Sequence, residues 1–536
     1  MSANKIDNKK LFWTAWPAVI IFTALYLIRG NTFEDDAYIF YRYAANWAAG
    51  YGPVYNVGEY VEGYSSLLWT IILAIGAFFS FDLVVLAPVL NLFIGITCII
   101  LTAYICTLIR FSRPRLTIII LTLLYALSYG FYYFGASGMD TLIFSLVLLL
   151  CIISLYKSLQ SGNYLLAFLS LILLNISRAE GLVYSVLLAA VWVYFTVKRH
   201  GSIPGRLLAA IFAFAAVTIL LFAARYAAYG ELMPATVLAK GFATYSFKQA
   251  VMHGDQAACK DFIRVVVSGL QYESFLFYLG AWIPFIVLLR KLNKADALLW
   301  LIAGGIIANI FVTVIAGGDY MPFKRHVIPA LPLLIVFTAW AWDLFLEKVR
   351  ESSLSKKAAL YAVAALVLIL WAGSFTEPRL ITKKYLLENE RTLALKQIGA
   401  YLHEVPGTTT MLTNMIGIVS YYAGPNVYVR DILGLTDIHN AKHGTTWGFN
   451  GGGDGVCGRT DFDYSFGAPF DIFFYNSPNM NKRFLSYCKN NPACGRYNHY
   501  ISDKWPGEYF YVVANTEHPV SAMFKDKFGA VSSPME

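Results

Sequence analysis

Residues that could carry chemistry gather between residues 31 and 66, in "NTFEDDAYIFYRYAANWAAGYGPVYNVGEYVEGYSS", directly after the first apolar segment. This stretch contains the acidic triplet Glu34, Asp35 and Asp36, and Glu62 follows further along. A carboxylate can accept a proton from a hydroxyl as a general base, or attack an electrophilic carbon as a nucleophile. The stretch therefore predicts acid–base or nucleophilic chemistry next to the first helix.

Other charged residues recur in short segments that we place on the same side of the membrane. They are Arg42, Asp140, Arg178, Glu180, Arg225, Lys240, Asp319, Lys324, Arg325 and His326. Charged groups near membrane depth are costly, and they are usually paired or functional. Carboxylates and cations gathered on one face suit a phosphorylated, anionic substrate delivered at the outer leaflet.

Each of these residues also has a structural interpretation. Asp35 is placed to be the N-cap of a helix, with Asp36 in its first turn and Gly50 as its stop. Arg178 and Glu180 could pair with each other at a helix end. The helix after Asp35 would carry an apolar stripe, which we expect to lie on the membrane surface: Ile39, Phe40, Tyr43 and Trp47.

Several chemistries lack their motifs in this sequence. We find no P-loop, GxSxG, HExxH or CxxC pattern, so neither a catalytic metal nor an organic cofactor is predicted. His326 could act as a ligand or base, although a structural or interfacial role is the more common one. The net charge of +9 comes largely from Lys and Arg in short loops between apolar runs, which indicates topology and not a nucleic-acid partner.

The composition indicates a polytopic α-helical membrane protein. Of the 536 residues, 58% are apolar and only 14% are charged. Apolar runs of about 17–25 residues recur, and each is long enough to cross about 30 Å of hydrocarbon.

The basic residues orient these spans. Lys5, Lys9 and Lys10 precede the first apolar run, which no cleavage site follows, so the N-terminus is expected in the cytoplasm. The piece at 65–80 is short, and we interpret it as an interfacial or re-entrant helix; an ordinary twelfth span is the alternative. The eleven predicted spans are 11–28, 84–109, 116–133, 141–157, 163–177, 181–197, 207–224, 274–290, 296–315, 327–346 and 357–374.

Residues 1–374 are thus predicted to form a membrane core, with large outer loops at 31–83 and 225–273. Residues 375–536 are rich in Gly, Asn, Asp, Tyr and Pro and contain no span, so they are predicted to form an outer mixed α/β domain. Four cysteines fall in predicted outer segments: Cys259, Cys457, Cys488 and Cys494. An even number fits disulfides on the oxidising side, and Cys488–Cys494 is the closest pair; three pairings remain open, as do free thiols.

Ordered blocks over residues 31–443 resemble one family. They are "EDDAYIFYRYAANWAAGYGPVYNVGEYVEGYSSLLWT", "SGMDTLIF", "SRAEG", "RYAAYGELMPATVLAKG", "GGDYMPFKRHVIPALP" and "DILGLTDIHNAKHG". These blocks resemble the family of the enzyme that adds terminal β-arabinofuranose to mycobacterial cell-wall arabinan, whose Gram-negative relatives modify pilin and other surface polymers. The sequence departs from the family at Asp140, where Glu is usual, and at Ala179, where Pro is usual.

The resemblance implies a GT-C glycosyltransferase in a bacterial inner membrane, with a periplasmic C-terminal domain. It implies a polyprenyl-phosphate sugar as donor and a periplasmic glycan or pilin as acceptor. Carried over by position, Asp35 or Asp36 is the catalytic carboxylate, with Asp35 preferred. Other roles follow from the charge of each residue and the side of the membrane on which we predict it. We expect Lys240, Arg325 and Arg178 to bind the donor phosphate. We expect the sugar or acceptor to be bound by Glu62, Asp319, Arg42 and His326.

The mechanism and two alternative functions stay open at this point. A carboxylate acting as a base gives inversion at the anomeric carbon, whereas attack by the carboxylate permits retention. A lipid-linked sugar flippase would show mid-span charges and paired repeats, and neither is seen. A polysaccharide ligase or polymerase would share the lipid-phosphate substrate and differ in donor size.

Overall fold

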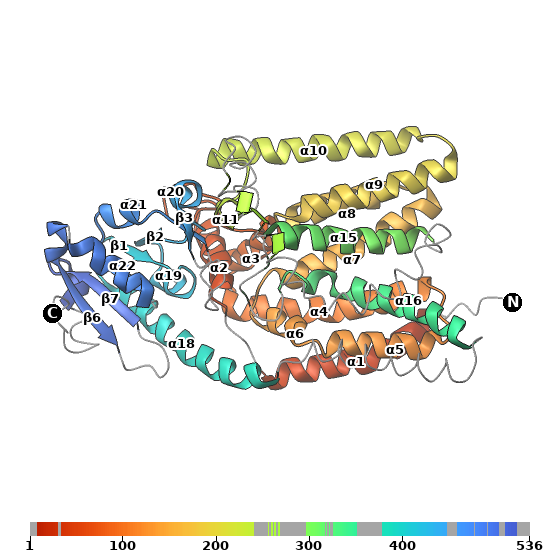
Figure 1. The fold of residues 1–536 in the computed structure, drawn as a ribbon, viewed down its shortest axis with the longest axis horizontal. Coiled ribbons are helices and arrows are strands. Elements are labelled where there is room, and N and C mark those ends of the chain that lie inside the picture. Colours follow the sequence, from red (N-terminus) through yellow and green to blue (C-terminus); the bar gives the residue numbers. More distant parts are fainter. Residues whose placement is uncertain are drawn as a thin grey trace. The chain divides into compact units, whose positions relative to one another are not determined.

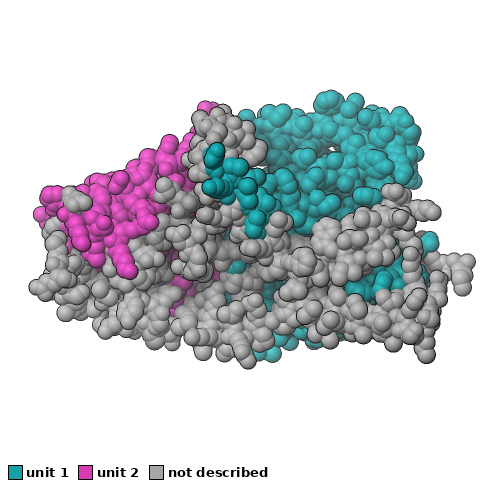
Figure 2. All heavy atoms as spheres, viewed as in Figure 1, with its two compact units in different colours: residues 1–31, 87–224, 241–378 teal, residues 32–86, 225–240, 379–536 magenta. Residues whose placement is uncertain are grey.

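The computed structural model describes most of the chain. The described residues are 8–29, 34–240, 296–316, 325–350, 378–447, 458–475, 478–489, 491–502 and 510–522, with isolated positions between 256 and 267 and at 318 and 321. The chain divides into two compact units, coloured separately in Figure 2. Unit 1 comprises residues 1–31, 87–224 and 241–378, and unit 2 comprises residues 32–86, 225–240 and 379–536.

Unit 1 is built from long apolar helices, and α7, α8, α9 and α15 pack against one another (Figure 1). Among the described residues, six helices are long and apolar enough to cross a membrane, or seven if the bent pair α5–α6 is one span. The prediction of a multi-pass helical membrane protein is therefore confirmed. The helices are α1 (Asn8–Arg29), α4 (Leu83–Leu108), α5 (Pro114–Ala126), α6 (Tyr129–Ala136), α7 (Thr141–Ser161), α8 (Leu165–Ser177), α9 (Gly181–His200), α10 (Gly205–Tyr229), α15 (Ala297–Ala316), η2 (Ile328–Ala330) and α16 (Leu331–Arg350).

Only some of the eleven predicted spans correspond to described helices that are long enough to cross a membrane. Two predicted spans, 274–290 and 357–374, lie outside the described residues. Those at 11–28 and 163–177 fall on α1 and α8, whose apolar parts are shorter than a full span, and 116–133 falls on the pair α5–α6, which bends by 50°. The count of eleven stays a prediction.

The short apolar piece at 65–80 forms α3 (Leu67–Phe78), a helix of 12 residues in unit 2. It begins where the Ser66 hydroxyl accepts a hydrogen bond from the backbone N–H of Trp69 (3.1 Å). Twelve helical residues extend about 18 Å, which is less than the roughly 30 Å of a hydrocarbon core. α3 packs against α2 (Asp35–Ala48).

The C-terminal part of unit 2 is a mixed α/β domain, as predicted. Its five-stranded sheet has the order β2-β1-β5-β7-β6, in which β1 pairs in parallel with β2 and β5, and β7 pairs antiparallel with β5 and β6. The strands of this sheet are β1 (Thr409–Thr413), β2 (Val427–Asp431), β5 (Ile472–Tyr475), β6 (Tyr497–Ser502) and β7 (Phe510–Asn515). The other elements are α11 (Ala235–Lys240), α18 (Pro378–Glu404), α19 (Ile418–Ala423), α20 (Ile438–His443), β3 (Thr445–Trp447), β4 (Gly458–Thr460), α21 (Phe462–Gly467), α22 (Pro478–Lys489) and η3 (Pro492–Arg496).

Aromatic side chains form much of this domain's core. The rings of Phe470 and Tyr497 stack with centroids 4.5 Å apart, and Phe473 and Phe484 pack in the same cluster. A disulfide joins Cys488 at the end of α22 to Cys494 in η3. Of the other two cysteines considered for pairing, Cys259 is exposed and free, and Cys457 lies outside the described residues.

Candidate functional site

Asp35 is the first residue of α2, and its carboxylate reaches a distant part of the chain. The N-cap position belongs to Glu34, whose side chain makes no capping hydrogen bond, so the expectation that Asp35 caps its own helix is wrong. Instead, the two carboxylate oxygens of Asp35 accept hydrogen bonds from the backbone N–H groups of Gly417 (2.9 Å) and Ile418 (2.8 Å). Burial raises the pKa of Asp35, and these two hydrogen bonds oppose that rise.

Gly417 is required for this contact because the two backbones approach closely. A Cβ atom added at Gly417 would lie 1.8 Å from the backbone oxygen of Asp35 and 2.7 Å from its Cγ. No side chain fits in that space. The start of α2 is therefore tied to α19 by a contact that only glycine allows.

Arg42, two turns along α2, is buried, with only 3% of the residue exposed. Its guanidinium donates to oxygens of the backbone of Tyr55 (2.8 Å), Ser420, Gly424 (3.2 Å) and Val427 (2.7 Å), and of the Asn56 side chain (3.4 Å). These contacts use all three guanidinium nitrogens. In the structure, Arg42 thus joins α2 and the segment that follows it to the C-terminal domain.

The apolar stripe of α2 is buried inside unit 2. Ile39, Phe40 and Tyr43 are at most 5% exposed, and α3 and α19 pack against the helix. The expectation that this stripe lies on the membrane surface is therefore wrong. Its partners are α3, which is nearby in the sequence, and α19, which is far away; the fourth residue of the stripe, Trp47, is partly exposed.

Asp36, the next residue, is oriented differently from Asp35. Its Oδ2 lies 3.8 Å from Nζ of Lys240, the last residue of α11, and the two side chains are 17% and 27% exposed. The backbone N–H of Ala235, at the start of α11, donates to the carbonyl oxygen of Glu62 (2.8 Å). Two contacts, the Asp36–Lys240 pair and this hydrogen bond, thus join residues 34–66 to the segment that carries Lys240.

Glu62 forms a second link between the same two segments. Its carboxylate binds the Arg225 guanidinium through two contacts, of 2.5 Å and 3.2 Å, and only 5% of Glu62 is exposed. Burial raises the pKa of Glu62, and the Arg225 partner opposes that rise. No specific role was predicted for Arg225. The sequence marked it only as a basic residue in a predicted outer turn.

In unit 1, Arg178 lies between two carboxylates. Its Nη1 is 2.7 Å from Oδ1 of Asp140, and its Nε is 2.5 Å from Oε1 of Glu180. Arg178 ends α8 and Glu180 precedes α9, so the two form the helix-end pair that the structural interpretation proposed. The two carboxylates together carry one negative charge more than is needed to neutralise Arg178.

Arg325 and His326 belong to the turn before η2 in unit 1. Arg325 is 5% exposed, and the carbonyl oxygen of His326 accepts a hydrogen bond from Nδ2 of Asn309 (2.6 Å). Asp319 lies outside the described residues, as does Lys324.

The predicted site residues therefore fall into two groups, each within one unit. Unit 2 holds Asp35, Asp36, Arg42, Glu62 and Lys240, and unit 1 holds Arg178, Arg325 and His326. Where the structure describes the chain, no group of three or more His, Cys, Asp or Glu side chains is arranged to hold a metal ion.

The block "DILGLTDIHN" also serves the fold. Asp431 is fully buried at the end of β2 and accepts hydrogen bonds from the backbone N–H groups of Leu433 and Thr436, both at 2.7 Å. Burial raises the pKa of Asp431 to about 7. Nothing in the sequence pattern singled out this carboxylate.

Comparison with known proteins gives similarity in structure only. No protein-family model matches the chain, and no curated protein matches it. The chain is similar to the crystal structure of ArnT from Cupriavidus metallidurans in the apo state, with 12% identity over 93% of this chain and 97% of that chain and a TM-score of 0.44. The crystal structure of the same protein bound to undecaprenyl phosphate is also similar, with 11% identity over 92% of this chain and 97% of that chain and a TM-score of 0.43.

A third similar structure is the Archaeoglobus fulgidus oligosaccharyltransferase in complex with Zn and sulfate. Identity is 11% over 94% of this chain and 73% of that chain, with a TM-score of 0.47. The similarity to all three structures is a partial similarity in fold.

Proposed function

We propose that the protein is a glycosyltransferase of the GT-C type that moves a sugar from a polyprenyl-phosphate donor to a hydroxyl group of a periplasmic acceptor. The resemblance of the sequence blocks indicates arabinofuranose as the sugar, and surface glycan or pilin as the acceptor. The observation that carries the proposal is the Asp36–Lys240 pair, in which a partly exposed carboxylate lies 3.8 Å from a partly exposed ammonium group.

Asp36 is the better candidate for the catalytic carboxylate, in place of the Asp35 that the sequence favoured. Both oxygens of Asp35 already accept backbone hydrogen bonds, whereas Asp36 has an exposed side-chain surface and a cation beside it. Asp35 would act as a positioning residue, because it fixes the start of the helix that carries Asp36.

The reaction needs a cation that stabilises the leaving phosphate and a carboxylate that accepts the proton of the acceptor hydroxyl. The bond between the anomeric carbon and the phosphate oxygen breaks, and the polyprenyl phosphate leaves with the electron pair. Lys240 would stabilise the negative charge that develops on the leaving phosphate. The acceptor oxygen bonds to the anomeric carbon as its proton passes to the Asp36 carboxylate, which inverts the configuration at that carbon.

A transfer assay in membranes tests this proposal. Polyprenyl-phospho-arabinofuranose is supplied to wild type, Asp36→Asn and Asp35→Asn at matched protein levels, and release of free polyprenyl phosphate is measured. We expect Asp36→Asn to be folded and inactive. We expect Asp35→Asn to lose thermal stability, with activity reduced in proportion to the folded fraction.

Two results would contradict the proposal. Near-normal release by Asp36→Asn would show that this carboxylate has no chemical role. A donor that wild type leaves chemically intact but moves across the membrane would identify a flippase.

A further inference from the structure

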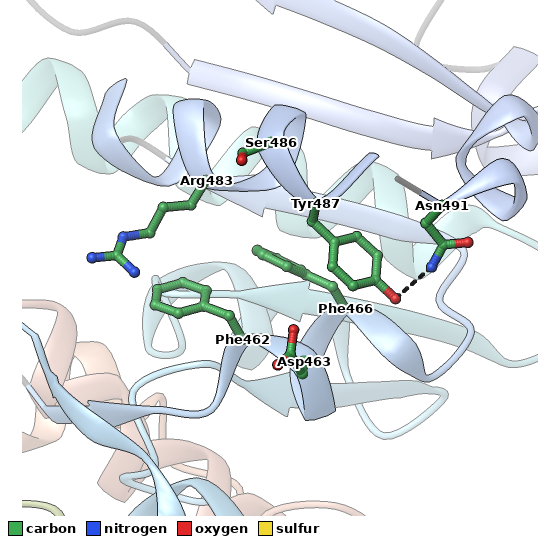
Figure 3. Close-up of a pocket in the computed structure, with 7 residues that line it drawn as sticks. All are labelled: Phe462, Asp463, Phe466, Arg483, Ser486, Tyr487 and Asn491. Atoms are coloured by element: carbon green, nitrogen blue, oxygen red, sulfur yellow. Dashed lines mark hydrogen bonds between the residues drawn. The ribbon is translucent and has the colours of Figure 1, made fainter. Parts of the chain in front are cut away.

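The C-terminal domain contains a cavity that the proposed reaction does not use. It lies between α21 and α22 and has a volume of about 470 Å³ (Figure 3). Sites for small molecules usually measure about 300–1,000 Å³. We call it the α21–α22 cavity.

Aromatic rings form one wall of this cavity. Phe462 and Phe466 are one helical turn apart on α21, and Tyr487 faces them from α22 (Figure 3). Phe462 and Tyr487 are only partly buried, and they pack against the aromatic core of the domain. The core thus supports ring faces that remain accessible from the cavity.

Among the described residues that line the cavity, one is a cation and one is an anion. The Arg483 guanidinium lies over the Phe462 ring, 4.6 Å from its centroid. Across the described parts of the chain, no carboxylate comes within ion-pair distance of Arg483, so its N–H groups are not committed to an acid. Asp463, on α21, lines the same cavity and is exposed.

The rim of the cavity is held in place by a covalent bond. Nδ2 of Asn491 donates a hydrogen bond to the hydroxyl group of Tyr487 (2.6 Å), shown as a dashed line in Figure 3. Asn491 lies in the short loop that the Cys488–Cys494 disulfide closes. The disulfide and the hydrogen bond together fix the position of Asn491 relative to the Tyr487 ring.

A neutral sugar matches this set of groups. Sugar rings present apolar C–H faces that pack on aromatic rings, and hydroxyl groups that both donate and accept hydrogen bonds. Guanidinium, carboxylate, amide and hydroxyl groups supply both kinds of partner, and the opposite charges of Arg483 and Asp463 do not favour an anion. We propose that the α21–α22 cavity binds a neutral glycan, namely the acceptor of the proposed transfer reaction; the acceptor role rests on that proposed function.

Binding can be measured without catalysis. Full-length protein in lipid nanodiscs is titrated with neutral arabino-, gluco- and manno-oligosaccharides, and saturation-transfer NMR gives the affinity. We expect at least one series to bind wild type. We expect Arg483→Gln to weaken binding at least tenfold at an unchanged melting temperature, whereas Lys482→Gln, at the neighbouring position on α22, stays within twofold of wild type.

The outcomes separate this inference from the proposed function. Absence of binding to wild type, or equal binding by wild type and Arg483→Gln, overturns the glycan site. Sugar transfer with an acceptor KM that Arg483→Gln leaves unchanged also overturns the cavity's role while supporting the transferase. Binding that depends on Arg483, in a protein that transfers no sugar, supports a glycan site and overturns the acceptor role.

Discussion

Asp35 and Arg42 bind opposite ends of the same short helix, α19. Asp35 accepts hydrogen bonds from the N–H groups of Gly417 and Ile418, and Arg42 donates to the carbonyl oxygens of Ser420 and Gly424. Seven residues of α2 rise about 10 Å, which matches the length of a six-residue helix, about 9 Å. An anion thus meets free N–H groups and a cation meets free carbonyl groups, as the termini of a helix require.

Replacing Arg42 should destabilise unit 2 strongly. Arg42→Lys keeps the positive charge, but one ammonium group cannot reach five separated oxygens, so buried carbonyl groups lose their donors. We expect a loss of about 3 kcal/mol, measured as a lower thermal unfolding midpoint of the purified protein. Arg430→Lys is the matched control, because Arg430 also donates to a backbone carbonyl, that of Ala468, but is only partly buried. Equal melting temperatures for the two variants would refute the structural role of Arg42.

Gly417→Ala should separate the start of α2 from α19. The added methyl group would lie 1.8 Å from the Asp35 oxygen, so one backbone must move and the two hydrogen bonds to the carboxylate must break. We expect faster cleavage of residues 410–425 in limited proteolysis and a large loss of transfer activity. Gly467→Ala serves as the control, since its nearest neighbour would be at an ordinary 3.8 Å. Proteolysis of Gly417→Ala at the wild-type rate would contradict the arrangement.

Asp431 should make stability depend on pH. Its pKa is about 7 in the folded domain, against an ordinary 3.8, so between these values the folded state binds a proton more tightly than the unfolded state. The contribution of Asp431 to stability is then greatest below about pH 4, falls by at most about 4 kcal/mol as the pH rises toward 7, and changes little beyond.

The measurement is the thermal midpoint of the full chain between pH 4 and pH 8. Asp431→Asn should make the profile less steep, even though its absolute stability is lower because one accepting oxygen is replaced by a donor. Glu517→Gln, which removes an exposed carboxylate, should leave the slope unchanged. Identical slopes for wild type and Asp431→Asn would exclude Asp431 as the source of the pH dependence.

The sequence predicted those features that depend on local pattern. Long apolar runs identified the multi-pass core, and alternating strand patches separated by turns identified the C-terminal sheet. The acidic residues ahead of an apolar stripe also predicted the helix that follows them, although they placed its N-cap at Asp35 and the structure has it at Glu34. In each case the deciding residues are neighbours in the sequence.

The pairing of the charged residues could not be predicted in the same way. The partner of Asp35 is Gly417, 382 residues away, and Glu62 and Arg225 are separated by 163 residues. In the sequence, the carboxylates between residues 34 and 62 look alike, whether they bind a backbone, an arginine or a substrate. Only the fold distinguishes Asp35, with both oxygens occupied, from Asp36, which lies beside Lys240.

Lys240 provides the sharpest kinetic prediction. If its ammonium group stabilises the leaving phosphate, Lys240→Gln should lower kcat by about 10²–10³, with a smaller effect on the KM of the donor and no change in melting temperature. Lys240→Arg keeps a cation for the phosphate and should recover most of the rate.

The control for Lys240 is Lys442→Gln. Lys442 pairs with Glu231 in the same unit, so this variant removes an equivalent charge at another position. Because the fields of exposed charges are screened beyond about 10 Å, it should leave kcat within twofold. If Lys240→Gln raises only the donor KM, Lys240 binds substrate and transition state equally, and the leaving group must be stabilised by another cation.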